Sequence, residues 1–194
     1  MEIGATKAVQ DRLKTTMIEE SKGASLVFCW DTHLTKIKGR NVLFIVNASN
    51  RYTIAMTDIE PRNWNYYAMY IIRVIHGMMQ EMGYSEEQIE QYFKMSGDTT
   101  VTKTHGRKSV GGINRMVMDA QYFGKKLEKE AKYQWELSEY LNRDICQPEG
   151  FDAYGYPSEL FKLDMERLGI AAKRKPAKVI DFRQYIESNR GTND

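Results

Sequence analysis

Hydrophobic residues recur along the first third of the chain with two periods, one typical of a helix and one typical of strands. Val9, Leu13 and Met17 are spaced four apart, which predicts a helix over residues 6–20. The period then shortens to two, and one apolar run has no polar interruption, as in a strand buried on both faces. Strands are predicted at residues 26–34, 42–46 and 51–57. Because short turns join them, they should form an antiparallel meander.

The helical period dominates after residue 60. Pro61 precedes a long apolar stripe, which predicts a helix over residues 62–82, and Ser85 begins a capping box for a shorter helix. Further helices are predicted over residues 110–142 and 158–168. Residues 99–104 are rich in threonine, which favours a fourth strand that pairs with the meander.

Together these elements predict an α+β fold. A small antiparallel sheet, consisting of a meander of three strands plus a fourth, should pack against helices. We assign residues 1–120 to an α+β core domain and residues 121–194 to a mostly helical C-terminal extension. The extension should pack on the core or support self-association. It contains a basic link at residues 173–176 and a last helical or extended piece at residues 180–186.

Composition and charge exclude several classes of protein. Of 194 residues, 42% are hydrophobic, which is enough for a buried core. Lys and Arg number 28 and Asp and Glu number 26, and a net charge of +2 excludes a uniformly basic nucleic-acid coat or an acidic mimic. Cys29 and Cys146 are too few for a disulfide scaffold. With neither a signal peptide nor a membrane span in the pattern, we expect a cytoplasmic protein without membrane association.

The sequence favours no catalytic or metal-binding pattern. His33, His76 and His105 are not at ligand spacing with another histidine or a cysteine, so we expect no metal site and no cofactor. Asp98 and Lys103 resemble the acid-plus-lysine arrangement of metal-dependent nucleases, but further carboxylates at matching positions are lacking. We therefore expect no catalytic residues, and a metal-dependent nucleic-acid-processing enzyme remains an alternative.

Two loop-rich stretches, residues 36–51 and residues 99–115, contain basic side chains and no acid. Such segments present cations and backbone N–H groups to phosphates, although charged turns are also ordinary solvated surface. If both stretches face one way, we expect them to bind RNA or DNA phosphates or an acidic protein. The predicted binding residues are Lys36, Lys38, Arg40, Arg51, Lys103, His105, Arg107, Lys108 and Arg115.

Several polar residues also recur at the offsets of a known family. They are Thr102-Lys103-Thr104, Arg107, Ser109-Val110 and Asn114, together with Trp30 and the asparagine-rich hairpin at residues 47–52. Over residues 1–120 the chain resembles a family of small, uncharacterised proteins of Firmicutes and of their phages and plasmids. That resemblance implies no activity.

The sequence also looks like the phage-borne anti-CRISPR proteins that inhibit type II Cas9. This resemblance implies a non-enzymatic inhibitor in the cytoplasm of a bacterial host. Its partner would be a Cas9–guide RNA complex, whose binding or cleavage of target DNA it would impair. A nucleic-acid-binding protein of mobile elements is the alternative hypothesis.

Overall fold

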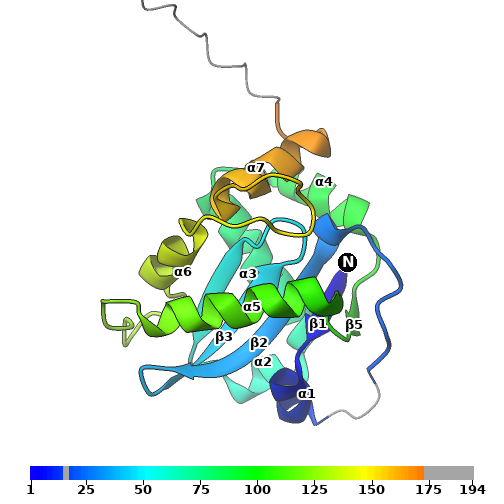
Figure 1. The fold of residues 1–194 in the computed structure, drawn as a ribbon. Helices are drawn as coiled ribbons and strands as arrows, with labels where there is room; N and C mark the ends of the chain where they lie inside the picture. The colour runs from blue at the N-terminus through cyan, green and yellow to red at the C-terminus, as the bar shows by residue number, and fades with distance from the viewer. Residues whose placement is uncertain (15–17, 173–194) are drawn as a thin grey trace, which may run out of the picture.

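Five strands form one mixed sheet in the computed structural model, which describes residues 1–14 and 18–172 (Figure 1). Their order is β4-β3-β2-β1-β5. The strands are β1 (Glu2–Ala5), β2 (Cys29–Ile37), β3 (Arg40–Asn47), β4 (Thr53–Thr57) and β5 (Thr100–Thr102). β2, β3 and β4 are antiparallel neighbours, whereas β1 runs parallel to both β2 and β5. The α+β class and the three-stranded meander are thus confirmed, but the sheet is mixed rather than wholly antiparallel.

The sequence pattern missed β1. Its four residues include Gly4 and are all buried, so they show no polar alternation. β1 lies between β2 and β5, and the predicted fourth strand therefore pairs with β1 and not with the meander. Pairing on both sides compensates for the weak strand propensity of this segment.

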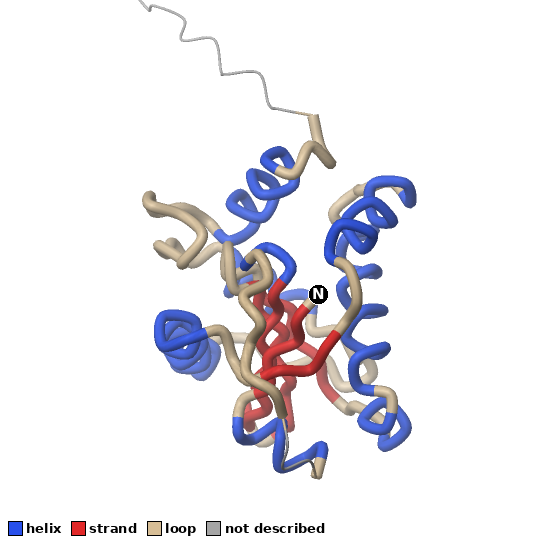
Figure 2. The backbone as a smooth tube through the Cα atoms, turned by 90° about the vertical axis from the view of Figure 1, so that its right-hand side faces the viewer, coloured by secondary structure: helices blue, strands red, loops and turns tan. Residues whose placement is uncertain are grey.

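Helices cover both faces of the sheet (Figure 2). They are α1 (Lys7–Leu13), α2 (Pro61–Asn65), α3 (Tyr67–Glu81), α4 (Glu86–Ser96), α5 (Gly106–Gln121), α6 (Trp135–Asn142) and α7 (Pro157–Arg167). In β3, Val42 and Phe44 join the apolar cluster under α5, while Leu43 and Ile45 join the cluster under α3. This confirms a strand buried on both faces. Among helices in the described part of the chain, none combines the length and apolar character needed to cross a membrane.

Two long predicted helices are each divided in the structure. The first separates into α2 and α3 at Tyr66, whose backbone leaves the helical region with φ −117° and ψ 44°. The second separates into α5 and α6, because the intervening chain turns to meet the sheet. The carbonyl of Lys132 accepts a hydrogen bond from the Thr57 amide at 2.7 Å. The capping box at Ser85 is confirmed. The segments predicted at residues 173–176 and 180–186 lie outside the described residues.

α6 covers the outer edge of β4, where its side chains form hydrogen bonds to the strand backbone in place of a neighbouring strand. Asn142 accepts from the Thr53 amide and donates to the Thr53 carbonyl, both at 2.8 Å. Ser138 accepts from the Ala55 amide at 3.0 Å. α7 contributes Phe161 and Met165 to the cluster under α3. The described chain beyond residue 120 is therefore packed on the core, and it protects a sheet edge that would otherwise expose unpaired backbone groups.

Replacing Asn142 by alanine should leave both backbone groups of Thr53 unpaired in a buried position. We expect the free energy of unfolding to fall by about 2–4 kcal/mol, measured by urea denaturation. Asn114→Ala is the matched control, since Asn114 is exposed on α5. Its effect should stay within about 0.5 kcal/mol. Equal effects of the two substitutions would contradict a role of α6 in closing the sheet.

Candidate functional site

The solvent-facing side of α5 collects three of the predicted binding residues. Arg107, Lys108 and Arg115 are all exposed there. Residues three and four apart share one face of a helix, so Arg107 and Arg115 align with Met118 and Tyr122, which are 61% and 80% exposed. We call these five residues the α5 surface. Because α5 has 16 residues, the surface runs for about 24 Å across one face of the sheet.

Intramolecular contacts leave the charges of the α5 surface accessible. The Lys108 ammonium donates to the Pro148 carbonyl at 3.3 Å, a neutral partner. Arg115 lies 3.3 Å from Asp119, and the Arg115 side chain remains 68% exposed. An ion pair with so much solvent contact is weak, so it does not prevent the guanidinium from binding another anion.

Arg51 lies against the middle of α5 and is half-buried. Its guanidinium donates to the Gly112 carbonyl at 2.9 Å. A Cβ at Gly112 would lie 3.2 Å from Arg51 Nε, so the glycine permits this close packing. The structure thus brings Arg51 next to the second basic stretch, but in a position that joins the β3–β4 turn to α5.

The β2–β3 hairpin carries the remaining residues of the first stretch. Lys38 reaches the chain after α5, where it donates to the Lys125 carbonyl at 2.9 Å and lies 5.8 Å from the centroid of the Phe123 ring. Arg40 forms an ion pair with Asp58 and hydrogen bonds to the loop after α5. Lys36 is exposed on β2. Of this stretch, Lys38 is therefore placed at the C-terminal end of the α5 surface.

Lys103 and His105 precede α5 and have different environments. Lys103 is exposed and forms an ion pair with Glu20. His105 is buried, with its side chain only 3% exposed. A buried ring does not reach a phosphate on the surface, so the structure separates His105 from the other predicted binding residues and places it in the interior.

The His105 ring lies between two buried carboxylates. Its Nδ1 is 2.7 Å from Asp31 and its Nε2 is 3.0 Å from Glu2. Asp31 also accepts from the hydroxyl of Ser109 in the first turn of α5, and from the backbone amide of His105. We call Glu2, Asp31, His105 and Ser109 the His105 network. It connects β1 and β2 with the beginning of α5.

Strand register explains how these charges meet. Gly4 of β1 pairs with Asp31 of β2, and the Asp31 carboxylate extends across the glycine. A Cβ at Gly4 would lie 1.8 Å from Asp31 Oδ1 and 3.1 Å from His105 Nδ1. Glu2 and Gly4 share one face of β1, because side chains alternate along a strand. Only a residue without a side chain at position 4 allows Asp31 and His105 to meet.

Opposite effects act on the pKa values in this network. Burial of the ring disfavours its charge, but hydrogen bonds to Asp31 and Cys29 and the attraction of their charges raise the pKa of His105 to about 10. Burial also opposes ionisation of Glu2. Hydrogen bonds from Ser21, the Lys22 amide and His105 outweigh that effect and lower the Glu2 pKa. These two shifts favour a charged His105 ring beside an ionised Glu2.

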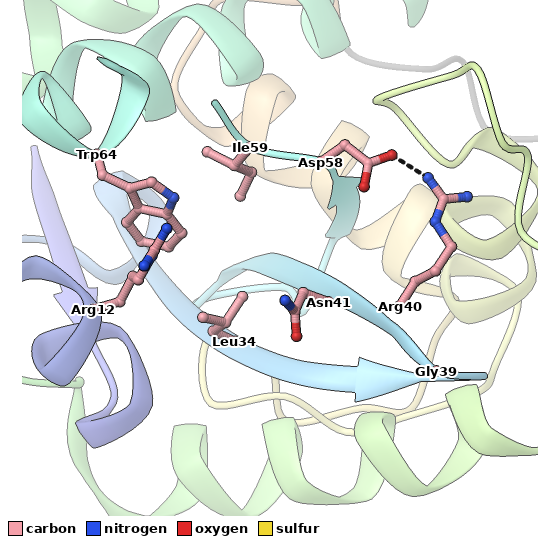
Figure 3. A pocket seen from close by; sticks show the side chains of 8 residues that line it. All are labelled: Arg12, Leu34, Gly39, Arg40, Asn41, Asp58, Ile59 and Trp64. Carbon is pink, nitrogen blue, oxygen red and sulfur yellow. Dashed lines mark hydrogen bonds and ion pairs between the residues drawn. The ribbon is translucent and has the colours of Figure 1, made fainter. Parts of the chain in front are cut away.

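A separate hollow of about 480 Å³ lies between α1, the β2–β3 hairpin and α2 (Figure 3). Leu34 and Ile59 line it between Trp64 and the Arg40–Asp58 ion pair. The Arg12 guanidinium lies 5.4 Å from the Trp64 ring centroid, and the Tyr67 ring stacks on Trp64 at 5.8 Å with an angle of 2°. Arg12 and Tyr67 thus already pack against the indole, and Trp64 is only partly exposed at this hollow.

The sequence pattern does not connect His105 with Glu2, Cys29 and Asp31, because these residues are far apart along the chain. Ser109 is close to His105 in sequence, but the Asp31 carboxylate that its hydroxyl contacts is distant. The signal that was available is Asp31, which directly follows the apolar run at residues 26–30. A buried carboxylate needs a partner that can neutralise it or donate a hydrogen bond to it, and the histidines were candidates for that role. Neither spacing nor composition indicated which histidine would pair with it.

Gly4→Ala should disrupt the His105 network. The new methyl group would displace the Asp31 carboxylate from His105. We expect the free energy of unfolding to fall by about 2–4 kcal/mol, measured by urea denaturation. Gly77→Ala on α3 is the control, since a Cβ there meets nothing within 4 Å. It should stabilise the protein by up to about 1 kcal/mol, and similar losses from both changes would refute a specific role for Gly4.

Two comparisons with known proteins, one with curated proteins and one with solved structures, found no match. A family model described as "Domain of unknown function (DUF6933)" matches residues 2–160. This range runs from β1, through the His105 network and α5, into α7. The chain therefore belongs to the DUF6933 family, a family defined by its sequence and without an assigned function.

Proposed function

We propose that this protein is a non-enzymatic binding module that docks on nucleic-acid phosphates through the α5 surface. The observation that carries the proposal is the exposed row of cations on one rigid helix. Arg107, Lys108 and Arg115 project from the same element, and Lys38 lies beyond its C-terminal end. Arginine and lysine on a helix are suited to phosphate contacts, which supply affinity without sequence preference.

Two further features suit this surface to a nucleic acid or to a protein–nucleic acid complex. Exposed Gly106 and Gly111 have no atoms within 4 Å of a Cβ position, so a phosphate backbone can approach the helix closely. Met118 and Tyr122 add apolar contact area at the other end of the row. An exposed tyrosine can stack on a base or anchor a protein interface.

Replacing Arg107 and Arg115 together by alanine should weaken binding and reduce its dependence on salt. Each phosphate contact contributes about 0.9 to the slope of log K against log salt concentration for duplex DNA, so the slope should fall in magnitude by about 2. Fluorescence anisotropy with labelled duplex DNA and with single-stranded RNA, at several salt concentrations, measures this slope.

The matched control is Arg73→Ala with Lys94→Ala. These cations are also exposed, but they belong to α3 and α4 behind the sheet. The control variant should keep the wild-type slope and affinity. If both double variants bind equally well, or if wild-type protein binds neither nucleic acid, phosphate contact through α5 is ruled out.

A narrower proposal names the partner as guide-RNA-loaded Cas9, following the resemblance to phage-borne inhibitors. The mixed character of the α5 surface, with cations at one end and apolar side chains at the other, is compatible with such a composite target. Added in excess to a type II Cas9–guide RNA complex, the protein should reduce cleavage of target DNA without degrading either nucleic acid. Full cleavage at a large molar excess would eliminate this partner while leaving the phosphate-binding proposal open to the anisotropy test.

The enzymatic alternative depends on Asp98 and Lys103. In the structure Lys103 forms an ion pair with Glu20. The Asp98 backbone carbonyl accepts from the N-terminal amine at 2.8 Å. Of the other strand-end acids, Asp31 belongs to the His105 network and Asp58 pairs with Arg40. The carboxylates of Asp31 and Asp58 thus have partners of their own, which counts against magnesium-dependent hydrolysis, because that reaction needs several carboxylates around the metal.

A further inference from the structure

We propose that Glu2, Cys29 and His105 form a binding site for one zinc ion beneath the beginning of α5. One ligand atom of each residue lies within 4.8 Å of the other two, and all three residues are buried. A carboxylate oxygen, a thiolate and an imidazole nitrogen are the donors that zinc takes in proteins. The inference is independent of the proposed function, because it concerns the interior and not the α5 surface.

Asp31 orients the histidine as a metal ligand requires. A histidine that binds a metal through one ring nitrogen commonly donates its other N–H group to a carboxylate, which fixes the orientation of the ring. His105 Nδ1 lies 2.7 Å from Asp31, so Nε2 faces Glu2. Asp31 is itself held by the Ser109 hydroxyl and the His105 amide. The ring is thus positioned before any ion binds.

The other two ligands are also held in place. Glu2 accepts from the Ser21 hydroxyl at 2.6 Å and from the Lys22 amide at 2.8 Å. Cys29 is fully buried, and its sulfur lies 3.6 Å and 3.5 Å from the carbonyls of Ala24 and Ser25. These are weak thiol hydrogen bonds that the residue can give up, and the thiolate is the form that binds metals.

The chemistry of the ligands decides how zinc would enter the site. Zinc binds the thiolate form of cysteine and the neutral form of histidine, so its binding would release protons from the cluster. Three protein ligands leave the fourth position of a tetrahedral ion to water.

Metal content and cobalt substitution test the site in the full-length protein. Protein purified from zinc-supplemented cells should contain about one zinc per chain by mass spectrometry of the metals. After removal of zinc with a chelator, added Co²⁺ should produce a thiolate-to-cobalt charge-transfer band. Cys29→Ser should abolish that band, whereas Cys146→Ser should retain it, because Cys146 is the other buried cysteine and is outside the cluster. Asp31→Asn should keep the band and weaken affinity by about 10–100-fold.

A second measurement covers the case in which a variant fails to fold. The thermal midpoint of chelator-treated wild-type protein should rise on addition of zinc and remain constant on addition of magnesium, which prefers oxygen ligands. Wild-type protein with no zinc, no cobalt band and no zinc-dependent midpoint would overturn the proposal and leave the cluster as a metal-free hydrogen-bond network. Retention of the band by Cys29→Ser, or its loss in Cys146→Ser, would overturn the assignment of the ligands.

Discussion

The contact between Asp31 and His105 across Gly4 is the constraint on which the rest of the structure depends. A buried carboxylate is costly unless a partner neutralises and hydrogen-bonds it. Here the partner lies 74 residues away and immediately precedes α5. Satisfying Asp31 therefore fixes the pairing of β1 with β2 and the point at which α5 starts on the sheet. A metal ion at Glu2, Cys29 and His105 would strengthen the same constraint.

α5 connects this buried network with the protein surface. Its inner side packs Ile113, Met116 and Ala120 on the sheet, while Arg107 and Arg115 face solvent. A helix fixed at its start and packed along its length presents its outer side chains in a defined arrangement. The net charge of the whole chain is only +2, although α5 carries a local row of cations. Such an arrangement suits recognition of a regularly spaced charge pattern such as phosphates.

The opposite edge of the sheet is closed by the chain beyond residue 120. Asn142 and Ser138 of α6 bond to the backbone of β4, and Phe161 of α7 enters the core. The family match extends to residue 160 and so includes α6. An uncovered β4 would invite pairing with other chains, so this packing protects the fold as well as extending it.

The sequence by itself determined the meander, the helical character of the chain after Pro61, the capping box at Ser85 and the α+β class, because each is set by local periodicity and by turn or cap chemistry. It did not show the break at Tyr66 that separates α2 from α3. Only the tertiary structure decided that β1 is a strand, that His105 is buried, and that α6 closes the sheet. These features depend on pairings between distant segments. A four-residue strand that contains Gly4 has no strong local strand propensity. His105 lies in a polar loop, and its carboxylate partners, Glu2 and Asp31, come close to it only when the sheet forms.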